Sequence, residues 1–331
     1  MAARHRLVVT LASPSKGGRV AASDVSAPAV VGSSRKKRKN STITRLYTAK
    51  SYPLWFLVPS AALFVVFFVV PSVASFYFAF TRWDFQESTW IGWANFQQFF
   101  AEPQLKDGLV HTMIYAVVTS GSKVVLGLPL AVLLTSNIIG RGLVRSIIFF
   151  PVLASTIGVG IAFKALMDPT AGLINQVLHT LGIPGPGWLT DPGLVLYSIA
   201  IVDIWKGVGL ATLIYMAGIL AIPRDYYEAA SVDGTSRFKQ FLYITLPLAW
   251  PATTTVITLS LIGGLRSFDL IWAMTRGGPG FASDVIASVI YKQYQAGFYG
   301  LSTAGNVVLF LLVAVIIMPL QWLLTKREVE L

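Results

Sequence analysis

The chain has 331 residues, of which 54% are hydrophobic and only 12% are charged, and its formal net charge at pH 7 is +11. About a quarter of the residues in soluble domains are charged, so this composition excludes an ordinary soluble protein. The chain contains no cysteine, which excludes disulfides, thiolate metal sites and cysteine nucleophiles.

Residues 1–50 are the first predicted region, a basic tail with no helical or strand periodicity. Eleven of the 26 Lys and Arg residues lie in this tail, including the run from Arg35 to Lys39. Its Ser-, Ala- and Gly-rich composition favours a disordered segment. A basic block before a membrane helix is typical of topogenic and lipid-headgroup contacts, so we expect membrane lipid and no nucleic acid as its partner. The membrane domain is expected to cover residues 51–331.

Six apolar runs follow the tail, and each is long enough to cross about 30 Å of hydrocarbon as a helix, which takes about 20 residues. We therefore predict an all-α, polytopic membrane protein with six transmembrane helices, the first of which is an uncleaved anchor. The expected spans are residues 54–80, 110–135, 143–166, 194–221, 249–272 and 304–325.

The basic residues between the spans predict the orientation, because cytoplasmic loops of membrane proteins carry an excess of Lys and Arg. With the amino terminus inside, eighteen Lys and Arg residues fall in cytoplasmic segments, four in outer loops and four within the spans. Two of those within the spans, Lys123 and Lys164, are expected to extend toward the membrane surface. Both termini are therefore expected in the cytoplasm, together with the loop between the fourth and fifth spans.

The first outer loop, residues 81–109, is rich in aromatic side chains. They occupy positions 83, 85, 90, 93, 96, 99 and 100. Aromatic residues at this density beside a span favour an interfacial belt or a short helix on the membrane surface. Contact with a ligand is the less favoured interpretation.

Two charged pairs fall within the predicted spans. Asp203 and Lys206 lie three residues apart in the fourth span, and Arg266 and Asp269 repeat this spacing near the outer end of the fifth. Pairing on one helix face lowers the cost of placing both charges in the membrane. These four residues, with Trp205, are candidates for a translocation path in which charged groups bind the hydroxyls of a solute and the indole stacks on a solute ring. Structural pairing between helices stays open as the alternative for both pairs.

The loop between the fourth and fifth spans reads RDYYEAASVDGTSRFKQFLYITLPLAWP over residues 224–251. Pro223 or Asp225 can start a helix, since Asp caps free amides and Pro is tolerated in a first turn. Gly234 interrupts this helix, and Thr235 or Ser236 can cap a second one. We therefore expect a helix–glycine–helix elbow along the inner membrane surface. It would present a carboxylate and two small alanines to a groove of another protein.

This loop resembles the EAA signature of ABC importer permeases, which reads approximately EAAxxDG, nine variable residues and IxLP. The matching residues are Glu228, Ala229, Ala230, Asp233, Gly234, Ile244, Leu246 and Pro247. The resemblance implies a type I importer-like fold in which the elbow is a coupling helix that inserts into a cytoplasmic ATPase. The chain has no G-x-x-x-x-G-K-[ST] motif, so we expect ATP and Mg on the partner ATPase, and no cofactor, metal or catalytic residue in this chain.

A second motif, FDLIWAMTRGGPG at residues 268–280, is followed by YKQYQAGFYGLSTA at 291–304. Together they resemble the outer region of carbohydrate importers of the MalF/UgpA type. Gly277, Gly278 and Pro279 predict a tight turn on the outer side, where a solute receptor would dock. The resemblance implies a non-catalytic permease for a sugar, polyol or glycerol phosphate in the cytoplasmic membrane of a bacterium or archaeon. The implied partners are a second permease, an ATPase dimer and an extracytoplasmic solute-binding protein.

Three other functions are weighed against this one. An ABC permease for amino acids or polyamines is the nearest, and the solutes bound by the receptor would separate the two. An ion-coupled secondary transporter often contains inverted repeats, and no internal repeat is evident. An intramembrane enzyme could use Asp203 and Asp269 as a dyad, but the chain has no H-E-x-x-H or G-x-S-x-G motif.

Overall fold

The computed structural model describes residues 54–136 and 138–326 of the chain. Two units meet between Pro59 and Ser60, and the second unit contains both strands and every helix from α3 onward. The predicted basic tail, residues 1–50, lies outside the described residues.

Every element in the described residues is helical except one short hairpin, which confirms the all-α prediction. In chain order the elements are η1 Leu54–Leu57, α2 Val58–Phe64, η2 Val65–Val69, α3 Val70–Phe78, β1 Thr81–Trp83, β2 Ser88–Trp90, α4 Ala94–Ala101, α5 Pro103–Thr135, α6 Arg141–Leu153, α7 Thr156–Leu166, α8 Leu173–Thr180, α9 Val195–Leu220, α10 Arg224–Val232, α11 Arg237–Gln240, η3 Phe241–Thr245, α12 Leu246–Leu248, α13 Trp250–Leu265, α14 Asp269–Met274, α15 Ile286–Gln295 and α16 Tyr299–Thr325.

Four stretches are long and apolar enough to cross a membrane without a sharp bend. They are Trp55–Phe78, Pro103–Thr135, Val195–Leu220 and Tyr299–Thr325. Two bent pairs qualify only when both halves are taken together: α6 with α7, at 101°, and the helix Arg237–Leu248 with α13, at 64°. Six spans are reached when each bent pair counts as one, but the fifth differs from the predicted residues 249–272. It joins Arg237–Leu248 to α13, which ends at Leu265 before the separate short helix α14.

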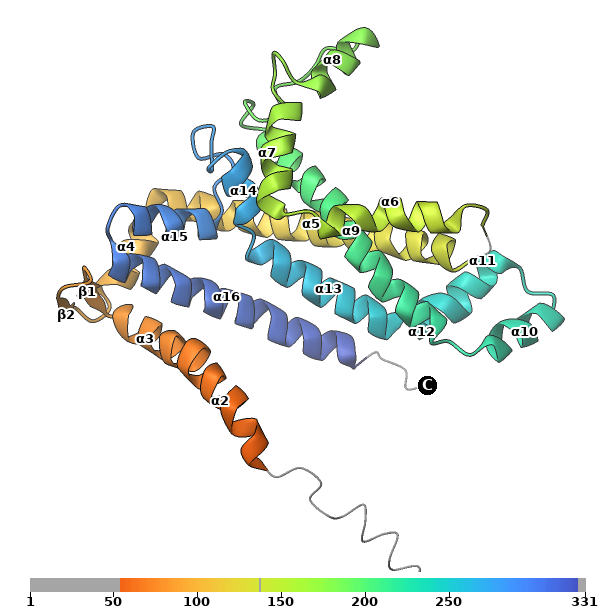
Figure 1. Ribbon diagram of the computed structural model, residues 1–331, viewed down its shortest axis with the longest axis horizontal. Helices are drawn as coiled ribbons and strands as arrows, with labels where there is room; N and C mark the ends of the chain where they lie inside the picture. Colours follow the sequence, from red (N-terminus) through yellow and green to blue (C-terminus); the bar gives the residue numbers. More distant parts are fainter. Residues whose placement is uncertain (1–53, 137, 327–331) are drawn as a thin grey trace, which may run out of the picture. The chain divides into compact units, whose positions relative to one another are not determined.

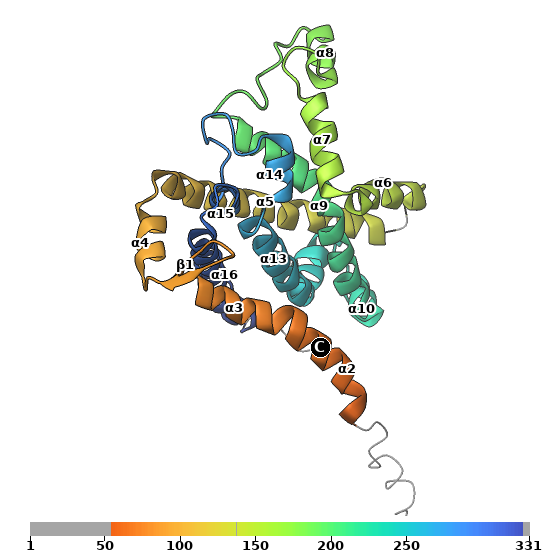
Figure 2. The same ribbon diagram turned by 60° about the vertical axis from the view of Figure 1, so that its left-hand side comes forward.

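The third predicted span, residues 143–166, is wrong as a single straight helix. The helix ends at Leu153, Ala154 is extended at φ −73° and ψ 142°, and α7 begins at Thr156. The last turn of α6 contains a proline, and Ser155 caps α7 by accepting a hydrogen bond from the Gly158 N–H at 3.4 Å. Both features favour a helix boundary here. In Figures 1 and 2, α7 and α8 extend away from the packed helices.

Helices α5, α9 and α13 form the packed centre of the second unit (Figures 1 and 2). Small residues allow their close approach. A Cβ atom on Gly127 of α5 would lie 3.0 Å from that of Ala211 in α9, and one on Gly264 of α13 would lie 2.7 Å from the Cα of Ala116 in α5. Helices in a membrane associate through such close van der Waals contact, so a larger side chain at either glycine would separate them.

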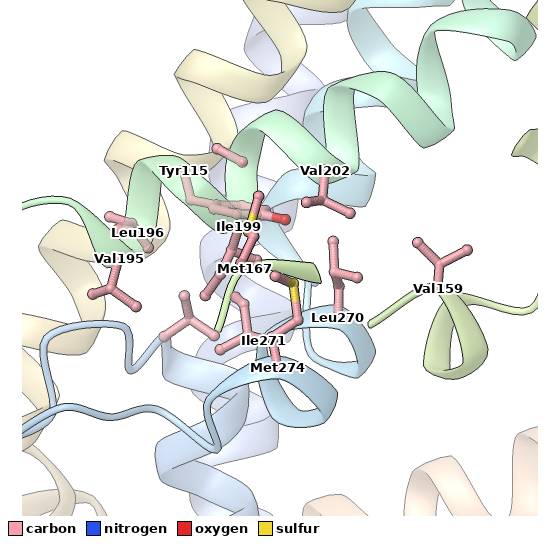
Figure 3. Packing of buried hydrophobic residues seen from close by; sticks show 12 residues of the cluster. Tyr115, Val159, Met167, Val195, Leu196, Ile199, Val202, Leu270, Ile271 and Met274 are labelled. Carbon is pink, nitrogen blue, oxygen red and sulfur yellow. The ribbon is translucent and has the colours of Figure 1, made fainter. Parts of the chain in front are cut away.

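A buried apolar cluster joins α5, α7, α9 and α14 (Figure 3). The side chains of Tyr115, Ile199 and Ile271 are fully buried in it, and Met274 is almost so. Because α14 contributes Ile271 and Met274, the cluster holds this short helix against the long ones. It thereby fixes the start of the segment that follows Met274.

The end of the second unit that the sequence predicts to face outward begins with the β1–β2 hairpin, in which Thr81 pairs with Trp90 and Trp83 with Ser88. Helix α4 follows and packs against α16. Two aromatic residues predicted for an interfacial belt are buried instead, since Phe96 is 8% and Phe99 1% exposed. They are three residues apart and lie on the face of α4 that contacts α16. The other aromatic residues of this loop are at least partly exposed.

Candidate functional site

The inner elbow, residues 223–248, has the helix–glycine–helix form expected from the sequence. Helix α10 begins after Pro223 and ends at Val232. Gly234 follows the capping residue Asp233, and its φ of +71° lies in the left-handed region that glycine adopts at little cost. The Thr235 N–H donates to the Ala230 carbonyl at 2.9 Å and the Gly234 N–H donates to the Ser231 carbonyl at 3.1 Å. These two bonds form a Schellman motif, which ends the helix and reverses the chain.

The second arm of the elbow runs from Arg237 to Leu248 and is tied back to α10 by side chains. Ser236 caps it by accepting a hydrogen bond from the Lys239 N–H at 3.4 Å. The hydroxyls of Tyr227 and Thr245 hydrogen-bond at 3.0 Å, and the Gln240 amide donates to the Ser231 hydroxyl at 3.1 Å. The two arms therefore hold each other in one geometry without help from another chain.

One face of α10 is open to the surroundings. Arg224, Tyr227, Glu228 and Ser231, at helical spacing, line a shallow surface depression. Glu228 and Ala229 are exposed, and Glu228 has no ion-pair partner among residues 54–136 and 138–326. Apolar side chains are exposed nearby, with Val232 at 88% and Phe238 at 70%. Charged and apolar groups are thus available together for another protein.

The elbow connects directly to the transmembrane helices. Its second arm meets α13 at a 64° bend, and Ala249 at the bend is buried. The Trp250 indole then donates a hydrogen bond to the Leu324 carbonyl near the end of α16 at 3.1 Å. Leu246 is half-buried and Pro247 is exposed just before the bend. A displacement of the elbow would therefore act on both α13 and α16.

The candidate path residues Asp203 and Lys206 do not pair as the sequence prediction had it. Asp203 of α9 pairs instead with Lys123 of α5, with the lysine Nζ 2.8 Å from the carboxylate Oδ2. The Lys123 side chain is only 10% exposed, so the prediction that it extends to the membrane surface is wrong. Gly207 leaves space for the Lys123 side chain, because a Cβ at this position would lie 2.6 Å from the lysine Cε. Trp205 packs on Phe163 of α7, with ring centroids 5.2 Å apart.

The second predicted pair, Arg266 and Asp269, does not form either. Helix α13 ends at Leu265, Phe268 has φ −139°, and α14 starts at Asp269. Because the helix breaks between them, the two side chains do not share a helix face. Both residues are exposed at this break, beside the outer end of α13.

The predicted outer turn lies in the outer loop, which we define as residues 275–285. Gly277 has φ +89°, and a Cβ there would overlap the Asp284 carboxylate; the Gly278–Pro279 peptide is cis. The Ser283 hydroxyl donates to the Gly278 carbonyl at 2.6 Å. Gly277 is thus required by close packing of the loop on itself, whereas Gly278 has room for a side chain.

Asp284 organises this loop, and the sequence prediction missed it. Its side chain is fully buried, accepts a hydrogen bond from the Ser288 hydroxyl at 2.7 Å and pairs with the Lys292 Nζ at 2.5 Å. The His111 Nδ1 of α5 lies 2.9 Å from the Asp284 carbonyl oxygen, so it donates to it. A Ser-Asp pair directly before an apolar helix suggests a helix cap, but the N-cap of α15 is Val285, so this pattern does not indicate the buried role of Asp284.

Comparison with known proteins gives matches over most of the chain. The family model for the binding-protein-dependent transport system inner membrane component matches residues 123–328. The trehalose/maltose transport system permease protein MalF of Thermococcus litoralis is 34% identical over 227 residues, covering 69% of this chain and 77% of that protein. The arabinooligosaccharides transport system permease protein AraP of Bacillus subtilis is 30% identical over 281 residues, covering 83% of this chain and 89% of that protein.

A solved structure shares the fold. It is the crystal structure of a bacterial ABC transporter involved in the import of the acidic polysaccharide alginate. One of its chains superposes with a TM-score of 0.75 at 24% identity, covering 85% of this chain and 99% of that one. The arrangement of helices described above is therefore that of an importer's transmembrane subunit.

Proposed function

The chain belongs to the binding-protein-dependent transport system inner membrane component family, and we propose that it is the permease subunit of an ATP-driven importer for a sugar or oligosaccharide. It is a multi-pass membrane protein and a transport subunit, not an enzyme. The proposed substrate class is supported by the relatives named for trehalose/maltose and for arabinooligosaccharides. A glycerol phosphate or other polyol is the neighbouring possibility within this class.

The inner elbow is the proposed coupling surface for a cytoplasmic ATPase. The single observation that carries this role is that Glu228 and Ala229 are exposed on α10. Their side chains take no part in the hydrogen bonds that hold the two arms of the elbow together. The exposed Val232 and Phe238 add apolar area, which interfaces bury at their centre. Closure of an ATPase dimer would pull the elbow and, through the 64° bend, tilt α13 and α16. ATP and Mg would be bound by that partner.

The translocation path is proposed along Asp203, Trp205 and Lys206 of α9 and along Arg266 and Asp269 at the break between α13 and α14. Asp203 remains 24% exposed while it pairs with Lys123, so its second oxygen can accept a hydrogen bond from a sugar hydroxyl. Trp205 is 42% exposed and offers a ring for stacking. Charged groups in the membrane-spanning region mark substrate pathways in many transporters.

The remaining partners follow from the same assignment. The outer loop with Gly277, Gly278 and Pro279 is proposed to contact an extracytoplasmic solute-binding protein, since its fold is held rigid by Asp284. A second permease subunit would complete the pathway, and membrane lipid would surround both. In this orientation the elbow and both chain termini face the cytoplasm, as the distribution of Lys and Arg favours.

Two alternatives are less favoured. An amino-acid or polyamine permease has the same architecture, but the relatives named above carry sugar substrates in their names. An ion-coupled transporter has no need of an exposed cytoplasmic elbow.

The substitution Glu228→Lys tests the coupling role. It reverses the charge on an exposed position, so we expect normal membrane insertion and thermal stability with ATP-driven uptake abolished. Uptake of trehalose, maltose and arabinotriose would be measured in proteoliposomes containing the complete importer. Glu87→Lys is the matched control, because Glu87 is exposed at the outer hairpin. Normal uptake by the Glu228→Lys variant would contradict the proposed role.

A further inference from the structure

A continuous series of aromatic rings runs from the turn of the β1–β2 hairpin, across α15, to the start of α14; Figure 1 labels these elements. We call it the aromatic track, and its members are Phe85, Tyr299, Tyr294, Tyr291, Trp272 and Phe268. Neighbouring ring centroids lie 4.3, 5.3, 6.2, 4.8 and 5.6 Å apart in that order. The roles proposed above for coupling, for the translocation path and for receptor contact do not involve these residues.

The rings of the aromatic track remain accessible. Phe85 is 57% and Tyr294 48% exposed, and the other members are partly buried. Phe85 also has φ +73°, which is an outlier for a bulky residue and is found at functional sites where surrounding structure enforces it. Here the Asp84 carboxylate enforces it by accepting the Glu87 and Gln86 N–H groups at 2.7 and 3.0 Å.

Polar groups accompany the rings. Among the described residues, the hydroxyls of Tyr291, Tyr294 and Tyr299 make no hydrogen bond within the chain. At the inner end of the track, the exposed Arg266 and Asp269 lie beside Phe268 at the break between α13 and α14. Aromatic faces with free hydroxyl, carboxylate and guanidinium groups are thus arranged along one route.

We propose that the aromatic track binds the pyranose or furanose rings of an incoming oligosaccharide and leads them to the outer end of α13. The proposal rests on the assignment of a sugar substrate. A sugar ring presents weakly positive C–H groups to the negative face of an aromatic ring, while its hydroxyls need donors and acceptors. The track supplies both. It lies on the hairpin, α15, the first residue of α16 and the start of α14, and it ends at two charged residues that a lipid chain would avoid.

The test measures sugar binding directly, by saturation-transfer NMR on the complete importer without its receptor, with maltotriose and arabinotriose as probes. Tyr294→Ala and Trp272→Ala are expected to raise the Kd about fivefold, the size of one lost aromatic contact. Tyr294→Trp, which keeps a ring, should retain binding. Phe100→Ala is the matched control, because Phe100 is an exposed aromatic residue outside the track. The effect should be greater for a trisaccharide than for its monosaccharide, since a series of rings contacts several sugar units.

Each outcome decides the proposal. An unchanged Kd in Tyr294→Ala and Trp272→Ala, with normal wild-type sugar uptake, would overturn the track and leave the proposed function standing. The same result with a lower thermal stability would identify the rings as a lipid-interface belt and also overturn it. If the wild-type importer takes up amino acids and no sugar, the proposed function itself fails. A raised Kd together with a raised KM for uptake, at unchanged protein amount and melting temperature, supports the track.

Discussion

The inner elbow and the outer loop both reverse the chain with a glycine of positive φ, yet they differ in what surrounds that glycine. Nothing lies within 4 Å of a Cβ added to Gly234, whereas a Cβ on Gly277 would overlap Asp284. The motif residues Glu228 and Ala229 of the elbow are exposed, while the side chain of Asp284 is fully buried. The elbow leaves its motif side chains free, as the proposed contact with another protein requires, whereas the outer loop is held by contacts within its own chain.

This difference separates two kinds of mutational effect. In the outer loop a substitution removes contacts within the chain, so the free energy of unfolding should fall. In the elbow an exposed substitution leaves the chain's own contacts intact, so transport should fall while stability is maintained. Each prediction below tests whether a substitution affects transport, stability or both.

The largest effect is expected at Gly234. In Gly234→Val a β-branched residue would have to adopt φ +71°, which costs about 1–2 kcal/mol, so the helix end and the angle between the two arms should change. We expect ATP-driven uptake to be abolished, while the protein still inserts and unfolds near the wild-type temperature. Gly142→Val is the control, since that glycine is equally open and lies within α6. Wild-type uptake by Gly234→Val would show that the elbow geometry is not needed.

The next effect is expected at Asp284. Asp284→Ala leaves Lys292 and Ser288 without their buried acceptor, and removing one partner of such a pair costs about 3 kcal/mol. Thermal unfolding in detergent should show this loss, together with a lower amount of protein in the membrane. Asp107→Ala, at an exposed aspartate of α5, should leave both quantities unchanged. If Asp284→Ala were as stable as the wild type, the outer loop would not be self-supporting.

A smaller effect is expected at the Lys123–Asp203 pair, which joins two spans and whose carboxylate is less deeply buried than that of Asp284. Lys123→Met leaves an unpaired carboxylate between α5 and α9, at a cost of about 2 kcal/mol, because the pair is partly exposed. Adding Asp203→Asn should restore most of this stability, as measured by a double-mutant cycle. Additive losses in the double variant would show that the two side chains do not stabilise each other.

The smallest effect is expected at the exposed hairpin turn. Hydrogen bonds from the Glu87 and Gln86 N–H groups lower the pKa of Asp84 below its ordinary 3.8. A carboxyl with a lowered pKa stabilises the fold above its ordinary pKa and loses this contribution as the pH falls through the lower, folded value. Amide-exchange protection at Gln86 and Glu87 should therefore decrease below about pH 3.8. In Asp84→Ala the protection should be low at every pH, and a wild-type pH profile in that variant would contradict the assignment.

Local sequence signals predicted the elbow well. A proline start, a glycine stop and a serine cap act within a few residues, and the structure has all three at Pro223, Gly234 and Ser236. The apolar runs likewise predicted the long helices, because about 20 apolar residues are needed for one crossing. The sequence did not predict the 101° bend between α6 and α7, although Pro151 and Ser155 were local signals for it.

Long-range contacts were not predictable from spacing. Asp203 has a lysine three residues away, yet its partner is Lys123, which lies 80 residues earlier. In the sequence, Asp284 resembles an ordinary loop aspartate. Only the folded structure shows that α5 and α15 pack around it. The contact proposed for Glu228 is a different case. Its partner residue belongs to another chain, so this chain's sequence does not identify it.

The most direct test of the central claim uses the absence of cysteine from the chain. A single cysteine is placed at Val232, which is 88% exposed beside the EAA motif, and cross-linking is carried out in membranes that contain the complete importer. We predict a covalent link to the ATPase subunit, with a yield that changes when ATP is added, and none from a cysteine at the outer residue Phe298. Labelling of the Val232 cysteine by an impermeant reagent from outside the cell, without any link to the ATPase, would contradict the account.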